Sequence, residues 1–343
     1  MCLITSQLTP YTLKSEITAY KIVKKKYNEE NVYISPFRYA TFDFVNNPSP
    51  IELSTGKDES HTKQNHGGKL SVGSGYFHAL LDPSQYSLYN EEEHTILKVT
   101  IPTSSTKINN KGEEEEIPTV IYLSDNMNEI CANNMKIYNE VVDINDAKTN
   151  ISDINDNIDY KTPEGVTVEY ADNNINITTP NCECTLVISS TNYNTEVQWS
   201  KVKVSSDITS QFPNQGKDLP KSYSSAKEYY NKGNEDTQVI RSLEQTYEQE
   251  NNKDICYEAV TKLASGEYMP SIGELYEIIK YQHYINYTLK LNNADNDKLL
   301  QSGIYWSSTP FSSNNAWAVN TNYITVNNLY ARQKNYLLLP VKA

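Results

Sequence analysis

The chain has few cationic side chains, and it lacks any long apolar run. Its 343 residues include 30 Lys and Arg against 43 Asp and Glu, a formal net charge of −13. This balance argues against a nucleic-acid-binding protein, which needs a basic face to neutralise phosphates. No apolar run approaches the ~20 residues of a membrane-spanning helix, and no secretion-signal pattern opens the sequence. We therefore expect no nucleic-acid partner, no membrane insertion and synthesis in a cytoplasm without a signal peptide.

Cysteine and histidine are also scarce, at five residues each. They are scattered, and no four-ligand zinc pattern can be assembled from them. Cys182 and Cys184 are one residue apart, which on a strand places both side chains on one face. The Asp- and Asn-rich segment 143–159 lacks the Gly and the closing Glu of a calcium loop, so it is predicted to be a solvated linker. We expect reduced structural thiols, no metal and no cofactor.

Tyrosine and asparagine, by contrast, are abundant. The sequence has 27 Tyr against 6 Phe, together with 39 Asn. AT-rich coding explains such an excess without any functional meaning. A recognition surface would explain it too, because tyrosine rings give contact area at low entropy cost and amides adapt their hydrogen bonds. Composition alone leaves both explanations open.

Three regions differ in their patterns, and together they predict a multidomain α+β fold. Residues 1–140 are interpreted as a mixed α/β attachment domain with polar connections, such as the acidic segment 103–116. These connections separate five expected strands, at 18–23, 32–35, 40–45, 95–101 and 119–123. Residues 141–212 carry turn residues every 8–12 positions, which is typical of a small β-rich domain, although a linker is the alternative. Strands are expected there at 166–170, 174–178, 184–189 and 197–204. Residues 213–343 begin with helical patterns and change to strand patterns after Gly303.

The last region gives the clearest local predictions. Ser271 and Glu274 have the spacing of a capping box, with apolar residues following at helical spacing. Further helices are expected at 222–230, 237–249 and 254–265. Four strands are expected at 304–308, 315–319, 323–326 and 336–341. Trp306 is interpreted as a core residue, whereas Trp317 could be either a core residue or a contact residue.

Several segments of this region occur in a recognisable order: Tyr268-Met269-Pro270-Ser271, Tyr305-Trp306-Ser307-Ser308-Thr309, Ala316-Trp317 and Pro340-Val341. They resemble the C-type-lectin-fold domains of the formylglycine-generating-enzyme-like branch, which are common in gut Bacteroidetes and their phages. The segment from Gly233 to Thr237 is similar to that family's entry into a helix. The resemblance covers about 125 residues, and it departs from the family where Leu339 replaces the usual Arg before Pro-Val.

This family includes the variable proteins of diversity-generating retroelements, in which the final stretch is rewritten at adenines and forms the ligand-binding face. The resemblance therefore implies a rigid scaffold with an adaptable polar and aromatic surface near the end of the chain. The implied ligand-binding residues are Asn314, Asn315, Trp317, Asn320, Asn322, Tyr323, Asn327, Asn328, Tyr330, Arg332, Lys334, Asn335 and Tyr336.

Enzymatic activity is not expected from this resemblance. The copper-dependent members need a pair of cysteines, and residues 213–343 contain only Cys256. The segments of calcium-dependent lectins are absent as well. The N-terminal motifs Met1-Cys2-Leu3-Ile4-Thr5 and Gly75-Tyr76-Phe77-His78 resemble short phage proteins that have no established activity. His78 could act as a base, but the sequence assigns no nucleophile to it, and a structural, hydrogen-bonded histidine is the alternative.

Three hypotheses follow for the whole chain. The first is a phage virion protein that is anchored to other virion proteins by its N-terminal part, forms a homo-oligomer, and binds a bacterial surface ligand through its C-terminal domain. The second is a capsid or tail decoration protein without ligand recognition. The third is a cytosolic enzyme centred on His78.

Overall fold

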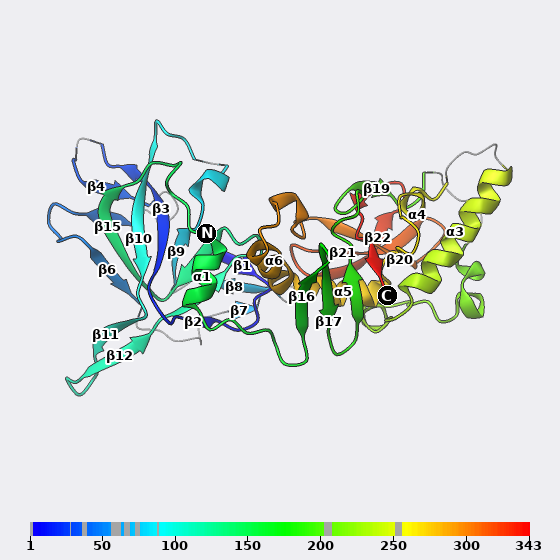
Figure 1. Cartoon of the computed structure of the whole chain (residues 1–343), viewed down its shortest axis with the longest axis horizontal. Helices are drawn as coiled ribbons and strands as arrows, with labels where there is room; N and C mark the ends of the chain where they lie inside the picture. Colours follow the sequence, from blue (N-terminus) through cyan, green and yellow to red (C-terminus); the bar gives the residue numbers. More distant parts are fainter. Residues whose placement is uncertain are drawn as a thin grey trace. The chain divides into compact units, whose positions relative to one another are not determined.

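The computed structural model describes residues 3–27, 29–35, 40–55, 63–64, 69–72, 76–87, 89–201, 208–250 and 256–343. The chain divides into two compact units, and each is described by itself (Figure 1). Unit 1 covers Met1–Asn65 and Lys69–Lys161, and the described residues of unit 2 lie within Thr162–Ala343. Helices and several separate sheets occur together, which confirms the predicted multidomain α+β fold.

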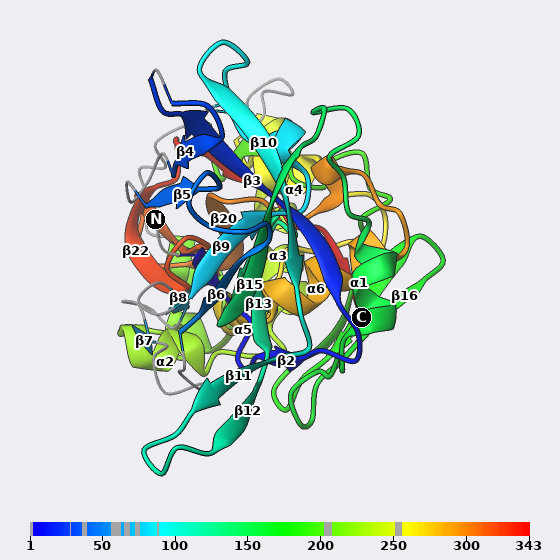
Figure 2. The ribbon, with the colours of Figure 1, turned by 90° about the vertical axis from the view of Figure 1, so that its left-hand side faces the viewer.

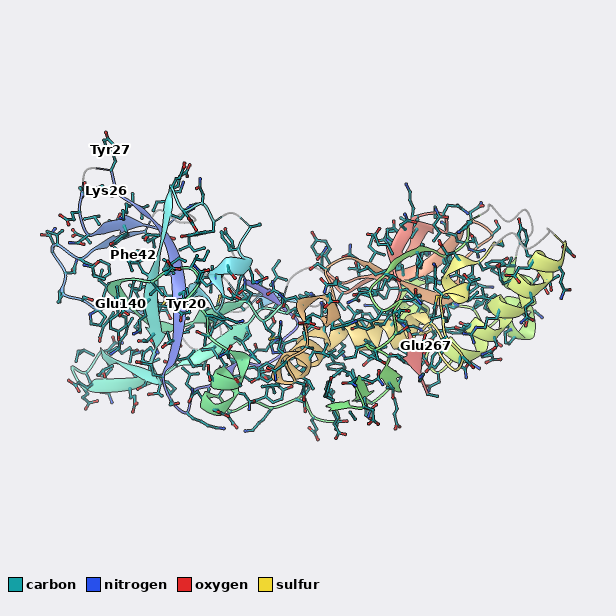
Figure 3. The ribbon with its side chains drawn as sticks, turned by 45° about the horizontal axis from the view of Figure 1, so that its top comes forward. Tyr20, Lys26, Tyr27, Phe42, Glu140 and Glu267 are labelled. Carbon is teal, nitrogen blue, oxygen red and sulfur yellow. The ribbon has the colours of Figure 1, made fainter. Side chains whose placement is uncertain are left out.

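Unit 1 is built on a large antiparallel sheet, and its strands β10, β13 and β14 are mostly buried. All five strands expected from the first 140 residues are present in it. The sheet contains β2 Tyr11–Thr12, β3 Ile17–Lys25, β4 Val32–Ile34, β5 Thr41–Asp43, β6 Ile51–Ser54, β9 Phe77–Leu80, β10 His94–Ile101, β13 Val120–Leu123, β14 Glu129–Ala132 and β15 Asn134–Val141. Tyr20 of β3 is buried, whereas Tyr27 beyond the end of β3 reaches outward and is 88% exposed (Figure 3).

A second, three-stranded sheet of unit 1 contains β1 Leu3–Thr5, β7 Lys63–Gln64 and β8 Leu70–Val72. A buried ion pair lies beside it, where Lys69 Nζ is 2.5 Å from Asp125 Oδ2. The other oxygen of Asp125 accepts hydrogen bonds from the backbone N–H and the hydroxyl of Ser6. Removing either charge would leave the other buried without its counter-charge, so this pair fixes where the start of the chain lies in unit 1.

Two segments of unit 1 differ from the sequence prediction. The segment 103–116 is mostly part of a hairpin, β11 Ser104–Ile108 with β12 Glu114–Pro118, because Asn109 Oδ1 accepts hydrogen bonds from two backbone N–H groups and closes the turn. The hairpin still extends away from the main sheet (Figure 2). The expected linker 143–159 contains the short helix α1 Ile151–Asn157, which buries Ile154.

The described residues of unit 2 form five α-helices and two sheets. The helices are α2 Tyr223–Lys227, α3 Gly233–Glu250, α4 Glu258–Thr261, α5 Ile272–Lys280 and α6 Gln282–Leu291. One sheet has the order β16 Thr167–Ala171, β17 Asn174–Thr178, β18 Glu183–Leu186 and β24 Val341–Lys342. The other has the order β19 Glu196–Gln198, β23 Asn335–Leu337, β20 Ile304–Pro310, β21 Asn315–Asn320 and β22 Thr325–Ala331.

The boundaries of these units differ from the expected ones at 140 and 212. The middle segment 141–212 is not a unit of its own, because β18 pairs with β24 and β19 pairs with β23 near the chain's end. Its first part instead belongs to unit 1, where Asp159 N–H donates to Thr12 O. The two strand pairings and the hydrogen bond to Thr12 all join residues far apart in the sequence, so no local pattern predicts them.

Of the expected strand 197–204, residues 202–204 lie outside the described residues, as do Asp254 and Ile255 of the expected helix 254–265.

The separate segments that carry the family resemblance meet inside unit 2. Thr237 Oγ1 accepts a hydrogen bond from Met269 N–H at 3.1 Å, which ties α3 to the segment before α5. Ser308 N–H donates to Pro270 O at 2.9 Å, and Ser307 Oγ donates to Trp317 O at 2.8 Å. The ordered motif is therefore a set of mutual, buried contacts.

The predicted capping box is confirmed at the start of α5. Glu274 Oε2 accepts a hydrogen bond from Ser271 N–H at 2.6 Å. Gly233 at the start of α3 lies so close that an added Cβ would be 2.4 Å from Glu274 Oε2 and 2.6 Å from Met269 O. Only glycine fits at this point, where helix α3 meets the cap of α5.

Asp236 is the buried acid at the centre of these contacts. Tyr229 donates to its Oδ1 at 3.1 Å, and the hydroxyls of Ser308 and Thr309 lie 3.4 and 3.3 Å from its Oδ2. Burial raises the pKa of Asp236 from 3.8 to about 8, and the hydrogen bonds from Tyr229 and Thr309 oppose that rise. The carboxyl group is therefore mostly protonated at neutral pH.

This raised pKa predicts a pH dependence of stability. The free energy of unfolding contributed by Asp236 is fully present below pH ~4 and is lost as the pH rises through 8, by up to about 1.4 kcal/mol per pH unit. Asp236→Asn keeps the shape without the titration, so its stability relative to the wild type should increase over this range. Urea unfolding at several pH values between 4 and 9 measures both proteins. Parallel pH profiles of the two proteins would contradict the assignment.

Candidate recognition surface

Most of the predicted ligand-binding residues lie in or beside β21 and β22, and β22 is an edge strand of the five-stranded sheet in unit 2. The last two, Asn335 and Tyr336, lie in β23. Strand β21 pairs with β22 on one side and with β20 on the other. Helix α5 contacts all three strands, and α3 contacts β20. The edge strand is therefore supported by a packed, hydrogen-bonded scaffold, which keeps the geometry of its outer side chains fixed.

Two of the predicted residues are buried and must be removed from the contact set. Trp317 is fully buried, and its indole N–H donates to Pro220 O. Arg332 is fully buried as well. Its guanidinium lies 4.4 Å from the centre of the Trp199 ring and donates to the backbone oxygens of Asn315 and Ser312. Both side chains stabilise the fold and do not reach a surface ligand. The expected core position of Trp306 is confirmed.

Four of the predicted residues share one face of the sheet and form what we call the aromatic–amide patch: Asn320, Asn327, Tyr330 and Tyr336. Their common face follows from the register, because residues directly opposite each other point the same way. Asn327 lies opposite Ala318, which lies opposite Trp306, and Tyr330 lies opposite Ala316. Each of the four is half-buried, so part of each side chain remains accessible.

The tyrosines of the patch are held in place by aromatic contacts. The ring of Tyr336 lies 4.8 Å from that of buried Trp306 and 5.1 Å from that of Tyr330, measured between ring centres. Burial raises the pKa of the Tyr330 hydroxyl, against the opposing effect of a hydrogen bond with Asn320, and burial also raises that of Tyr336. Both phenols thus remain neutral hydrogen-bonding groups, and their rings pack on the apolar core that contains Trp306.

The remaining predicted residues lie outside the patch. Asn322 and Tyr323 are exposed in the turn between β21 and β22, where Asn320 Oδ1 accepts a hydrogen bond from Asn322 N–H. In the same turn, buried Ile324 has a positive φ of 50°, which is strained for a β-branched residue. Of the others, Asn328 lies in β22, Asn315 begins β21 and Asn335 begins β23. Asn314 precedes β21, and Lys334 lies between β22 and β23.

The sequence pattern did not identify Leu329, whose side chain is 71% exposed. It lies in β22 at a break in the pairing register between Ala316 and Ala318 of β21. Such a bulge changes which side chains point outward. Strand alternation cannot reveal this shift, so no signal in the sequence alone marks Leu329 as a surface residue.

Neither a metal centre nor a membrane span is found in the described parts of the chain. Within them, no group of three or more His, Cys, Asp or Glu side chains is arranged to hold a metal ion. No helix among those residues has the length and apolar character needed to cross a membrane. Comparison with protein-family models, curated proteins and solved structures finds no match for this chain.

The burial of Arg332 gives a direct test of its structural role. Arg332→Ala would remove the stacking on Trp199 and the hydrogen bonds to Asn315 O and Ser312 O, so the free energy of unfolding should fall by about 3 kcal/mol. Lys334→Ala is the matched control, because Lys334 is a nearby exposed cation and its loss should change stability by less than ~0.5 kcal/mol. Urea unfolding compares the two, and equal midpoints would contradict the structural role of Arg332.

Proposed function

We propose that this chain is a virion-associated receptor-binding protein whose unit 2 is a C-type-lectin-like domain that binds a bacterial surface ligand. The observation that carries this proposal is the aromatic–amide patch. It places two half-buried tyrosines and two amides on one face of a rigid sheet. Neutral phenols and amides above a buried tryptophan suit the recognition of either a protein or a glycan.

The distribution of burial supports adaptable recognition. The motif residues that hold unit 2 together, such as Thr237, Ser307 and Trp317, are fully buried. The patch residues and the surrounding turn residues are half-buried or exposed. Substitutions at the outer positions therefore cost little stability, and the face can change its specificity while the scaffold stays the same. Display on a homo-oligomer would add avidity to a weak single site.

One observation favours the second candidate function, a decoration protein that packs against its neighbours in the particle. Leu329 and Tyr323 are exposed apolar side chains, 71% and 48% accessible, in β22 and in the turn that leads into it. Apolar side chains of this kind would become buried if a neighbouring subunit covered the edge strand. Electron microscopy of the particle distinguishes the two functions, because a covered edge would exclude receptor binding there.

Binding to whole Bacteroidetes cells tests the receptor-binding function. The double variant Asn327→Ala, Tyr330→Phe removes polar groups of the patch while keeping the buried ring, so cell-bound protein should fall at least tenfold, which is about 1.4 kcal/mol of binding free energy. Glu169→Ala, at an exposed position in β16 of the other sheet, is the matched control and should bind like the wild type. Melting temperatures confirm that both variants fold. Unchanged binding of the double variant would refute the role of the patch.

A further inference from the structure

Unit 1 contains a thiol and an imidazole in direct contact. His78 of β9 and Cys131 of β14 lie opposite each other in adjacent antiparallel strands. The distance from Cys131 Sγ to His78 Nδ1 is 3.1 Å. Their contact follows from strand register, which fixes both side chains on one face of the large sheet. A thiol within hydrogen-bonding distance of an imidazole is the usual arrangement for an activated cysteine nucleophile.

Both N-terminal motifs contribute to the surroundings of this pair. Leu3 of the first motif and Tyr76 of the second lie in one buried cluster with Cys131, Val72 and Val120. Met1, Cys2 and Gly75, which belong to the same motifs, lie outside the described residues. The fold thus brings residues of two separate motifs together around the Cys131 thiol, although neither motif contains Cys131.

The titratable groups near the pair come from three strands and from the segment before β9. Tyr122 of β13 lies directly opposite Cys131, and Tyr76 precedes β9 in the same cluster. Glu129 of β14 is two residues before Cys131 on the same face and is half-buried, and burial raises its pKa. Tyr20 of β3 lies opposite Leu80, and Lys21 Nζ donates to His78 O at 2.8 Å.

We propose that Cys131 and His78 form an acyl-transfer site for an ester or thioester with an apolar acyl group. This site is independent of the recognition surface on unit 2. His78 Nδ1 takes the proton of the Cys131 thiol, and Sγ forms a bond to the carbonyl carbon. The carbon–leaving-group bond breaks, and the leaving alkoxide or thiolate receives the proton from His78. Water then attacks the acyl-cysteine, with His78 taking the water's proton and returning a proton to Sγ.

The apolar substrate class follows from the burial of the thiol. Cys131 is fully buried among aliphatic and tyrosine side chains, so an apolar acyl group suits its surroundings. Access requires local opening of the residues that cover the thiol, which include Leu3 of β1, a strand of only three residues. His78 and Glu129 are half-buried on the same face, so the site borders solvent on their side.

Other buried thiols of the chain provide an internal comparison. Burial raises the pKa of Cys256 to about 12, and the neighbouring Glu244 adds to the effect. Cys184 lies 3.8 Å from Cys182, and the contact with that thiol and burial raise the pKa of Cys184 well above the ordinary value. Neither environment favours a thiolate, so these cysteines should react slowly at neutral pH.

Alkylation of the folded full-length chain by iodoacetamide tests the activation of Cys131. Peptide mass spectrometry follows each cysteine separately between pH 5 and 9. At pH 7, Cys131 should react at least tenfold faster than Cys256. In His78→Gln, the rate at pH 7 should fall at least tenfold and rise only near the ordinary thiol pKa of ~8.5. Equal alkylation rates of Cys131 and Cys256 in the wild type would overturn the proposal, and this comparison does not depend on whether a variant folds.

Acyl transfer itself is tested with p-nitrophenyl esters of acetate, butyrate and octanoate. The wild type should release p-nitrophenol and carry the acyl mass on Cys131, with faster release from the longer chains. Cys131→Ser should lose the adduct and at least 90% of the release. Absence of an adduct on Cys131, or equal release by Cys131→Ser, would overturn the acyl-transfer step. Neither result bears on cell binding, which tests unit 2 separately.

Discussion

The architecture of unit 2 depends on buried hydrogen bonds between three segments that are distant in sequence. Helix α3 contributes Asp236 and Thr237, the segment before α5 contributes its backbone from Met269 to Ser271, and β20 contributes Ser308. Polar groups buried in a low dielectric are costly when unpaired and strong when paired. The three segments therefore form one cooperative arrangement, and this is what makes the sheet beneath the aromatic–amide patch rigid enough to present side chains at fixed positions.

Sequence reasoning succeeded where a structure is decided by neighbouring residues. The capping box of Ser271 and Glu274 needs only a four-residue window, and β17 has the predicted bounds because its alternation is regular. The order of the motifs in unit 2 could also be recognised in the sequence, although the contacts between the motifs could not be predicted from it. Hydroxyl and backbone groups such as those of Ser307 and Pro270 carry no local sign of which distant partner they bind.

Where distant partners decide the outcome, the sequence was insufficient. Arg332 lies among Asn and Lys residues and has every local sign of a surface cation, yet Trp199 and two carbonyl oxygens bind it inside the core. The middle region has the turn spacing of a separate domain, but its strands complete the sheets of unit 2. In the same way, His78 acquires a thiol neighbour through strand register alone, and no motif spacing relates it to Cys131.

The abundance of tyrosine shows why composition could not decide function. Many of the 27 tyrosines lie in the core, and Tyr11, Tyr122, Tyr284, Tyr287 and Tyr305 are among the largest fully buried side chains. A buried tyrosine fills space as a phenylalanine would, but its hydroxyl needs a hydrogen-bond partner. The hydroxyl of Tyr305, for example, donates to Asn194 Oδ1. Tyr330 and Tyr336 differ because they lie at the boundary, with one side on the core and the other accessible. This boundary position follows from the pairing of β22 with β21 and of β23 with β19 and β20. It separates tyrosines able to contact a ligand from those that fill the interior.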